Sequence, residues 1–227
     1  MTRIVKDADV RRDELLDAAL ALFLEHGYER TSVEQITIAV GVAKGTFYHY
    51  FATKQELLEQ LVERFTDDVF AEGERTLAAA GGTAQERLRN FMVASSQTKL
   101  GRKDETLMLT RSLFTPENEA LLNHLIEGWI DRTRPLMLQI VEQGCAEGTF
   151  DVEYPAAMTE VWLSLWYGYG IRISRLFFAA QDDSRRIEEL VAAVRVLEVA
   201  QERILGLAPG SLDMNMEAAL RLVLSER

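Results

Sequence analysis

Residues 41–51 read Gly-Val-Ala-Lys-Gly-Thr-Phe-Tyr-His-Tyr-Phe, and this stretch decides the fold of the N-terminal part of the chain. Gly41 is expected to end a short helix that begins after Ser32, and a second short helix is expected from Lys44 to Tyr50. Ser32 and Gln35 have the spacing of a capping box, in which each side chain bonds the other residue's backbone N–H. Two short helices joined at a glycine, after a longer first helix, are typical of a helix-turn-helix unit.

The second helix of such a unit enters the major groove of DNA with its N-terminal residues against the bases. Gly45 has no side chain, so DNA can approach the backbone there. The other exposed positions of this helix carry groups that bond bases or phosphates. Hydroxyl and N–H groups at the start of the preceding helix, and a lysine at the start of the following one, are placed for phosphates. The candidate DNA contacts are Thr31, Ser32, Lys44, Gly45, Thr46, Tyr48, His49 and Lys54. Phe47 and Phe51 are expected to face the core.

The run formed by Gly27-Tyr28, residues 31–36, residues 41–51 and residues 54–58 resembles the DNA-binding domain of the TetR family of transcriptional regulators. The resemblance is contiguous over about residues 11–58. It implies a helix-turn-helix DNA-binding domain at 1–54 and an α-helical effector-binding and dimerisation domain at 55–227. The sequence departs from the family at Ala43, where a Ser or Thr N-cap is frequent, and at Ile38, which is apolar at a position that is often polar. Without the full residue string, spacing alone also allows residues 44–51 to be an aromatic core segment of a helical enzyme.

Helical periodicity dominates the rest of the chain, and no stretch alternates convincingly as a strand. Thr53 is a plausible N-cap, and Thr83 with Glu86 forms a second capping box. Pro135 lies inside a helical pattern and is expected to kink or break it, because proline lacks a backbone donor and clashes with the preceding turn. The predicted fold class is all-α with nine or ten helices, the last at about residues 213–224.

The resemblance also implies that the last long helices, at about 156–180 and 183–206, pair with a second subunit as a four-helix bundle. Helix 183–206 is apolar on several sides, more than one core face requires. Gly168 and Gly170 would let another helix approach helix 156–180 closely. The alternative is that both helices belong to the core of a single chain.

Aromatic residues and methionines cluster in the central helices, where they could line a pocket for an apolar effector. The same pattern is also typical of core packing. Arg111 and Glu160 lie in otherwise apolar helices, and Glu160 near two tryptophans suits a cationic ligand. The candidate pocket residues are Phe91, Met92, Met108, Arg111, Phe114, Trp129, Met137, Trp162, Trp166 and Tyr169.

The composition narrows the class of protein. The 227 residues include 25 Lys+Arg and 36 Asp+Glu, a net charge of -11, which argues against a protein that coats nucleic acid. Residues 1–55 hold seven basic and eight acidic residues, so the acidity belongs to the rest of the chain. One cysteine excludes a disulfide framework.

The longest uncharged apolar-rich run, Val161 to Ile171, is too short to cross a bilayer, and no signal region is evident. A cytoplasmic protein with no membrane partner is therefore expected.

Catalytic motifs are sparse. The three histidines, His26, His49 and His124, are scattered, and no nucleotide-binding or nucleophile motif occurs. We therefore expect no enzyme, no catalytic residue, no metal site and no cofactor.

The sequence predicts a ligand-responsive regulator, namely a repressor that binds a palindromic operator as a homodimer and is released by a small, largely apolar effector. Two alternatives remain open. One is an all-α lyase that uses Asp67-Asp68 or Asp182-Asp183, although neither pair completes a metal-binding motif. The other is a helical dimer that binds small molecules without DNA.

Overall fold

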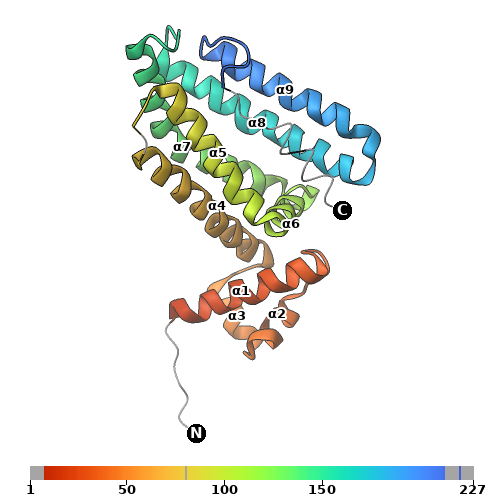
Figure 1. Cartoon of the computed structure of the whole chain (residues 1–227). Coiled ribbons are helices and arrows are strands. Elements are labelled where there is room, and N and C mark those ends of the chain that lie inside the picture. Colours follow the sequence, from red (N-terminus) through yellow and green to blue (C-terminus); the bar gives the residue numbers. More distant parts are fainter. Residues whose placement is uncertain (1–7, 80, 213–219, 221–227) are drawn as a thin grey trace. The chain divides into compact units, whose positions relative to one another are not determined.

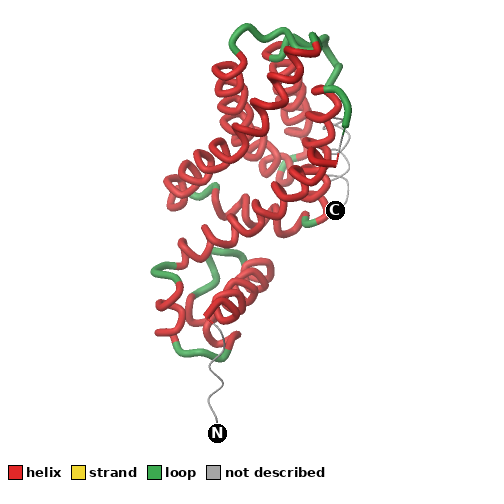
Figure 2. Tube along the Cα trace, turned by 90° about the vertical axis from the view of Figure 1, so that its left-hand side faces the viewer, coloured by secondary structure: helices red, strands yellow, loops and turns green. Residues whose placement is uncertain are grey.

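The computed structural model describes residues 8–79, 81–212 and 220, and it is helical throughout (Figure 1). This part of the chain forms nine α-helices and two short 3₁₀ turns, and it contains no strand (Figure 2). The predicted all-α class is confirmed. The helix predicted at about 213–224 lies outside the described residues, Leu220 excepted.

The described chain divides into two compact units, which we call unit 1 and unit 2. Unit 1 contains residues 8–70 and 98–122, and unit 2 contains residues 71–97 and 123–212. The helices that follow the first 54 residues are therefore shared between the units. The functional boundary at residues 54 and 55 stays a prediction.

Unit 1 is built around the helix-turn-helix segment. Its elements are α1 (Ala8–His26), α2 (Val33–Val40), α3 (Lys44–Tyr50), the first part of α4 (Lys54–Ala79), α6 (Lys103–Leu113) and the 3₁₀ turn η1 (Pro116–Asn118). Leu15, Ala19 and Phe23 form the buried stripe of α1. Helix α1 packs against α2 and also against α6, so a segment far along the chain completes this unit.

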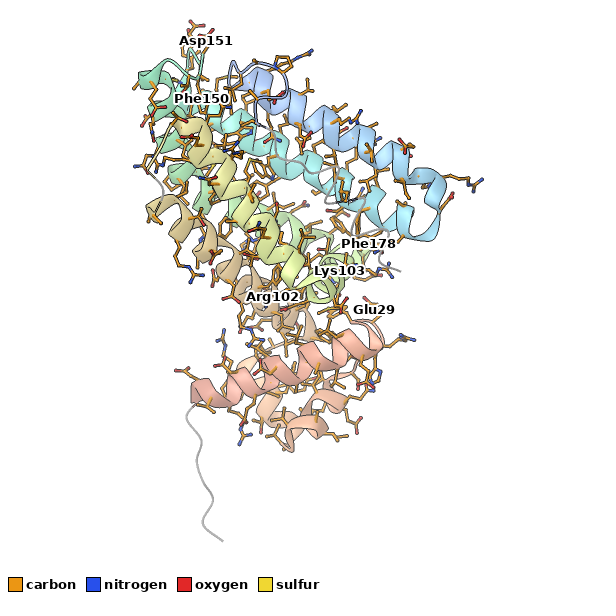
Figure 3. All side chains as sticks on the ribbon, in the orientation of Figure 1. Glu29, Arg102, Lys103, Phe150, Asp151 and Phe178 are labelled. Carbon is orange, nitrogen blue, oxygen red and sulfur yellow. The ribbon has the colours of Figure 1, made fainter. Side chains whose placement is uncertain are left out.

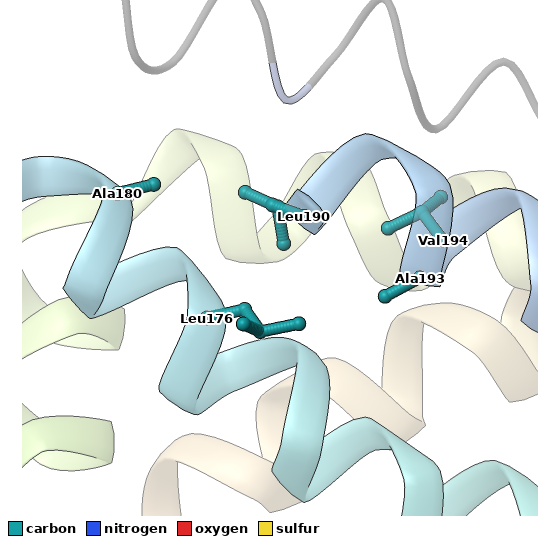
Figure 4. Packing of buried hydrophobic residues seen from close by; sticks show 5 residues of the cluster. All are labelled: Leu176, Ala180, Leu190, Ala193 and Val194. Carbon is teal, nitrogen blue, oxygen red and sulfur yellow. The ribbon is translucent and has the colours of Figure 1, made fainter. Parts of the chain in front are cut away.

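Unit 2 consists mainly of long helices. They are α5 (Ala84–Gly101), α7 (Glu119–Glu147), α8 (Pro155–Asp182) and α9 (Ile187–Ile204), with the 3₁₀ turn η2 (Ser184–Arg186) before α9. Helices α8 and α9 pack side by side. Figure 4 shows part of the apolar seam between them, formed by Leu176, Ala180, Leu190, Ala193 and Val194.

The predicted helix caps are present. Ser32 and Gln35 form both bonds of the capping box at the start of α2. At the start of α5 the Glu86 carboxylate accepts the N–H of Thr83, and the Thr83 hydroxyl accepts the N–H of Glu86. The Thr53 hydroxyl accepts the N–H of Glu56, as expected of an N-cap. These caps satisfy backbone donors that the first turn of a helix leaves unbonded.

Of the kink or break predicted at Pro135, the break is wrong, because α7 runs without interruption from Glu119 to Glu147, and the kink stays a prediction. Proline removes the single hydrogen bond that its N–H would donate to the carbonyl of Asp131. The residues that follow it, Met137, Ile140 and Val141, are buried, and this packing holds the second half of the helix in place.

The loop after α9 is fixed by short backbone contacts. The N–H of Asp151, in the loop between α7 and α8, donates to the carbonyl of Leu205 (3.1 Å), and Figure 3 labels Asp151 in that loop. The buried Glu202 carboxylate accepts the N–H groups of Gly210 and Leu212 at 2.8 and 3.1 Å. Gly206 lies between these contacts with a φ of +68°.

We predict that Gly206→Ala destabilises the protein by about 1–3 kcal/mol. A Cβ atom at this position would lie 2.7 Å from the backbone oxygen of Asp151, and the positive φ adds strain. Urea unfolding measures the change. The matched control is Gly128→Ala in α7, where a Cβ meets open space and a stabilisation of roughly 0.5–1 kcal/mol is expected. Equal effects of the two substitutions would contradict this account of the loop.

Candidate DNA interface and effector region

The turn between α2 and α3 is closed by Gly41. This residue has φ 72° and ψ 37°, a left-handed conformation that glycine adopts without strain, and its N–H bonds the carbonyls of Ile38 and Thr37. The N–H of Val42 also donates to the carbonyl of Thr37. Helix α3 starts directly afterwards without a side-chain cap at Ala43. The sequence therefore specifies the helix-turn-helix geometry locally.

Helix α3 has one buried and one exposed face. Phe47 is fully buried, and its ring lies 5.5 Å from that of Phe51, as the sequence predicts. The candidate contacts Lys44, Gly45, Tyr48 and His49 are exposed, and Thr46 is half-buried. The side of α3 that faces away from the core thus carries the predicted groups.

Two side-chain contacts order the exposed face of α3. The Lys44 ammonium lies 6.0 Å from the centre of the Tyr48 ring. The His49 and Tyr50 rings meet edge to face at 4.9 Å. A Cβ added at Gly45 would meet open space, so the backbone there is accessible. This surface offers donors and an aromatic edge without a carboxylate on α3 itself.

Lys54 has a different environment from the one predicted. Its ammonium donates to the carbonyls of Tyr28 (2.8 Å) and Thr31 (3.0 Å), and it lies 4.1 Å from the centre of the Tyr28 ring. Burial lowers the pKa of Lys54, and the negative charge of Glu29 opposes this shift. Lys54 therefore fastens the start of α4 to the turn between α1 and α2.

The two hydroxyl groups before α2 also serve the fold. Thr31 is buried, and its hydroxyl is bonded to the carbonyls of Gly27 (2.9 Å) and Leu22 (3.3 Å). The exposed Ser32 hydroxyl donates to the Gln35 side chain and accepts the Gln35 N–H. Thr31 thus positions the turn, while Ser32 remains at the surface. The phosphate contacts predicted for Thr31, Ser32 and Lys54 stay predictions.

Tyr28 connects this turn to a later part of unit 1. Its ring packs edge to face on Phe23 at 5.2 Å. Burial, followed by the charge of Glu29, raises the pKa of Tyr28, whereas a side-chain hydrogen bond with Asn118 lowers it. Asn118, in η1, is buried and also donates to the carbonyl of Ser112 (2.8 Å). Asn118 cannot be recognised as a functional residue from the sequence, because nothing in its local pattern distinguishes it.

Arg102 joins α4 to the beginning of α6. It donates to Asp68 (2.7 Å) and makes two bonds to Glu105 (2.8 and 2.6 Å), and its guanidinium lies 4.6 Å from the Phe65 ring centre. The bonds to Glu105 are the main reason why the pKa of Arg102 is raised. Figure 3 labels Arg102 and Lys103 at this helix start. Asp68, one of the aspartates of the lyase alternative, is thus engaged in an ion pair.

The candidate pocket residues are distributed over both units. Met108, Arg111 and Phe114 belong to unit 1, and the other seven belong to unit 2. Phe91, Met92, Met137 and Trp162 are buried, whereas Arg111 is exposed. Trp129, Trp166 and Tyr169 are half-buried. The lining of an effector pocket by these residues stays a prediction.

Two polar contacts within unit 2 involve Glu160 and Trp162, both of which were considered above for ligand binding. Glu160 is half-buried and forms an ion pair with Arg134, so it does not lie buried among the tryptophans. Trp162 donates from its indole nitrogen to the buried side chain of Gln201 (3.2 Å), and its ring packs edge to face on Trp166 at 5.8 Å. Gln201, which the sequence analysis did not select, accepts this bond between α8 and α9.

Each of the helices α8 and α9 has an exposed face with small and apolar side chains. On α8 it contains Val161, Ser164 and Gly168, and on α9 it contains Ala192, Val196 and Val199. Val161 and Val196 are 53% and 56% exposed. Because the other side of α9 is buried against α8, this helix is apolar on two faces, as the sequence indicates.

Within the described ranges, no three His, Cys, Asp or Glu side chains are grouped as they would be around a metal ion. In the same residues, none of the helices has the length and apolar character needed to span a membrane.

Comparison with known proteins identifies the family. Residues 15–61 match the family described as "Bacterial regulatory proteins, tetR family". The chain is 31% identical over 197 residues to the HTH-type transcriptional repressor KstR of Mycolicibacterium smegmatis, covering 85% of this chain and 89% of KstR. It is 28% identical over 177 residues to the repressor KstR2 of Mycobacterium tuberculosis, covering 75% of this chain and 88% of KstR2. The protein belongs to the TetR family and is a helix-turn-helix transcriptional regulator.

Solved structures show the same fold. A TetR-family regulator from Pectobacterium atrosepticum has a TM-score of 0.62 at 22% identity, covering 90% of this chain and 98% of that one. FadR of Bacillus subtilis, solved in complex with stearoyl-CoA, has a TM-score of 0.58 at 19% identity, covering 82% of this chain and 96% of FadR. The whole length of these regulators therefore corresponds to the helical architecture described above.

We predict that Lys54→Met lowers the free energy of unfolding by about 2 kcal/mol, because it leaves two backbone carbonyls without their charged donor. The control is Lys44→Met, since the exposed Lys44 side chain is expected to contribute within roughly 0.5 kcal/mol. Chemical denaturation of both variants makes the comparison. If Lys54→Met is as stable as Lys44→Met, Lys54 does not fasten the turn.

Proposed function

We propose that this protein is a ligand-responsive repressor that binds a palindromic operator as a homodimer. The observation that carries the proposal is the exposed face of α3, where Lys44, Tyr48 and His49 surround an accessible backbone at Gly45. The named relatives KstR and KstR2 are repressors, which supports repression over activation. A regulator of this kind acts on DNA in the cytoplasm and needs no catalytic group, metal ion or cofactor.

The candidate DNA-contact residues fall into groups according to whether their polar groups are exposed or already bonded within the protein. Lys44, Thr46, Tyr48 and His49, together with the backbone at Gly45, are proposed to meet bases and phosphates directly. Ser32 and the first turn of α2 are proposed to meet a phosphate. Thr31 and Lys54 are proposed to orient α2, and Lys54 is also proposed to add positive charge near the DNA backbone.

We predict that Lys44→Ala weakens DNA binding and reduces its salt dependence. Loss of one phosphate contact in each subunit lowers the slope of log K against log salt concentration by about two for a dimer. Fluorescence anisotropy with a duplex from the region upstream of the protein's own gene, measured at several salt concentrations, provides the slopes. Arg89→Ala removes the same charge from the exposed side of α5 and is the control. An unchanged slope for Lys44→Ala would remove Lys44 from the interface.

The second copy of the chain is proposed to pack on the exposed face of α8 and α9. The residues of this face recur at intervals of three and four positions on both helices, as in helices that pack against each other. Gly168 and Ser164 allow close approach, and the valines supply apolar area. Dimerisation places two recognition helices in successive major grooves, about 34–36 Å apart.

Substitution of Val196 by glutamate is expected to convert the dimer to a monomer, because it places two carboxylates in an apolar interface. Sedimentation velocity at micromolar concentration measures the oligomeric state. Val10→Glu introduces the same charge at a valine of α1 that is 48% exposed, and this variant should remain a dimer. Val196→Glu that sediments as a dimer would assign the interface elsewhere.

The effector is proposed to be small and largely apolar, and to bind among the aromatic and methionine side chains of the central helices. FadR, which has the same fold, was solved in complex with stearoyl-CoA, and the apolar acyl chain of that ligand supports an apolar part in the effector proposed here. Binding must favour a state with a different spacing of the recognition helices, since a ligand shifts an equilibrium only by its preference for one state. Extraction and mass spectrometry of the purified protein would identify a bound molecule directly.

A further inference from the structure

Unit 1 contains more than the helix-turn-helix segment. Residues 98–122, which include α6 and η1, belong to the same compact unit as α1, α2 and α3. Helix α6 packs on α1, and the Gln55 side chain of α4 reaches the carbonyl of Glu117 in η1 (3.5 Å). Helix α6 and η1, which begin more than 50 residues after the end of α3, are therefore part of the body that carries the recognition helix.

Asn118 makes the most specific of these connections. It is 2% exposed, and its amide nitrogen donates to the carbonyl of Ser112 near the end of α6. Its side chain also bonds the Tyr28 hydroxyl. The buried Asn118 side chain thus joins α6 to the turn between α1 and α2.

From Tyr28 the connection continues to the start of α2. The Lys54 ammonium lies on the Tyr28 ring and bonds the carbonyls of Tyr28 and Thr31. Thr31 directly precedes Ser32, the N-cap of α2, and α2 leads through Gly41 into α3. Each step of this connection from Asn118 to α3 is a hydrogen bond, a ring contact or the covalent backbone. All of its residues lie in unit 1.

We propose that Asn118 is a positioning residue for DNA binding, which acts through Tyr28 and Lys54 to hold α2 and α3 in the arrangement that fits the operator. The inference rests on the proposed DNA-binding function. Asn118 itself contacts no DNA. Its loss therefore weakens binding without removing a phosphate contact, and this distinguishes it from Lys44.

The test uses the full-length variants Asn118→Ala and Tyr28→Phe and the double variant, with a labelled duplex that the wild-type protein selects from a random pool. Tyr28→Phe is expected to weaken binding about threefold to tenfold, the effect of one neutral hydrogen bond, and Asn118→Ala, which also removes the bond to Ser112, at least as much. The salt slope should equal that of the wild type. The double variant should bind like the weaker single variant, because both substitutions remove the same bond.

Asn123→Ala, at an exposed asparagine of α7, and Tyr154→Phe, at an exposed tyrosine before α8, are the matched controls and should bind like the wild type. All measurements are made at least 15 °C below the midpoint of thermal unfolding of the least stable variant, so that unfolding does not reduce the active fraction. If Asn118→Ala is too unstable to be measured 15 °C below its unfolding midpoint, Tyr28→Phe alone tests the same expectation.

Three results would overturn the proposal: unchanged affinity of the variants, an altered salt slope, or additive losses in the double variant. The first would show that the connection does not affect binding, and the second that Asn118 meets a phosphate. The third would show that Asn118 acts by a route other than Tyr28. A wild-type protein that selects no duplex from the pool would instead contradict the proposed function.

Discussion

The arrangement of the helix-turn-helix depends on one ammonium group. Lys54 Nζ bonds the carbonyls of Tyr28 and Thr31 and lies against the Tyr28 ring, and so it joins the first residue of α4 to the turn that precedes α2. Helices α2 and α3 are short, with 8 and 7 residues, and helices of this length are not stable alone in water. Their orientation comes from the packing of buried residues such as Ile36 and Phe47 and from contacts at their ends. The capping box of Ser32, the left-handed Gly41 and the Lys54 bonds supply these contacts.

The same turn shows why unit 1 extends beyond residue 70. The turn that presents two carbonyls to Lys54 also carries Tyr28, which is buried, so its hydroxyl needs a partner within the protein. Asn118 supplies that partner from η1. The Arg102 side chain fastens the other end of α6 to Phe65 and Asp68 of α4. Both ends of α6 are therefore tied to the body that carries the recognition helix, and α6 cannot shift without a change in these contacts.

Features that depend on neighbouring residues could be predicted from the sequence, and features that depend on distant residues could not. The capping boxes at Ser32 and Thr83 and the turn at Gly41 are local, and all three are present. The role of Lys54 depends on two carbonyls that lie 23 and 26 residues before it in the sequence. The role of Asn118 depends on the Tyr28 hydroxyl, which is separated from it by a still longer stretch of sequence. Pro135 failed as a helix breaker for a related reason, since buried residues on its C-terminal side outweigh one lost hydrogen bond. The unit 2 residues selected for a pocket proved to include a buried core, because methionine and aromatic residues at helical spacing look the same in both settings.

The distribution of charge bears on why DNA binding depends on two copies of the chain. The helix-turn-helix segment within residues 1–55 is called the head here. Residues 1–55 are nearly neutral although the whole chain has a net charge of -11, so a single head gains little from general attraction to phosphate. Affinity must then come from specific contacts on a small surface, and from linking two such surfaces. A dimer that holds both heads at the spacing of the operator makes the second contact effectively intramolecular, which raises affinity without new contacts and loses that gain when the spacing is wrong. A weak and precisely positioned head is therefore easier for an effector to release than a strongly basic one, because a small change in spacing is enough to forfeit the second contact.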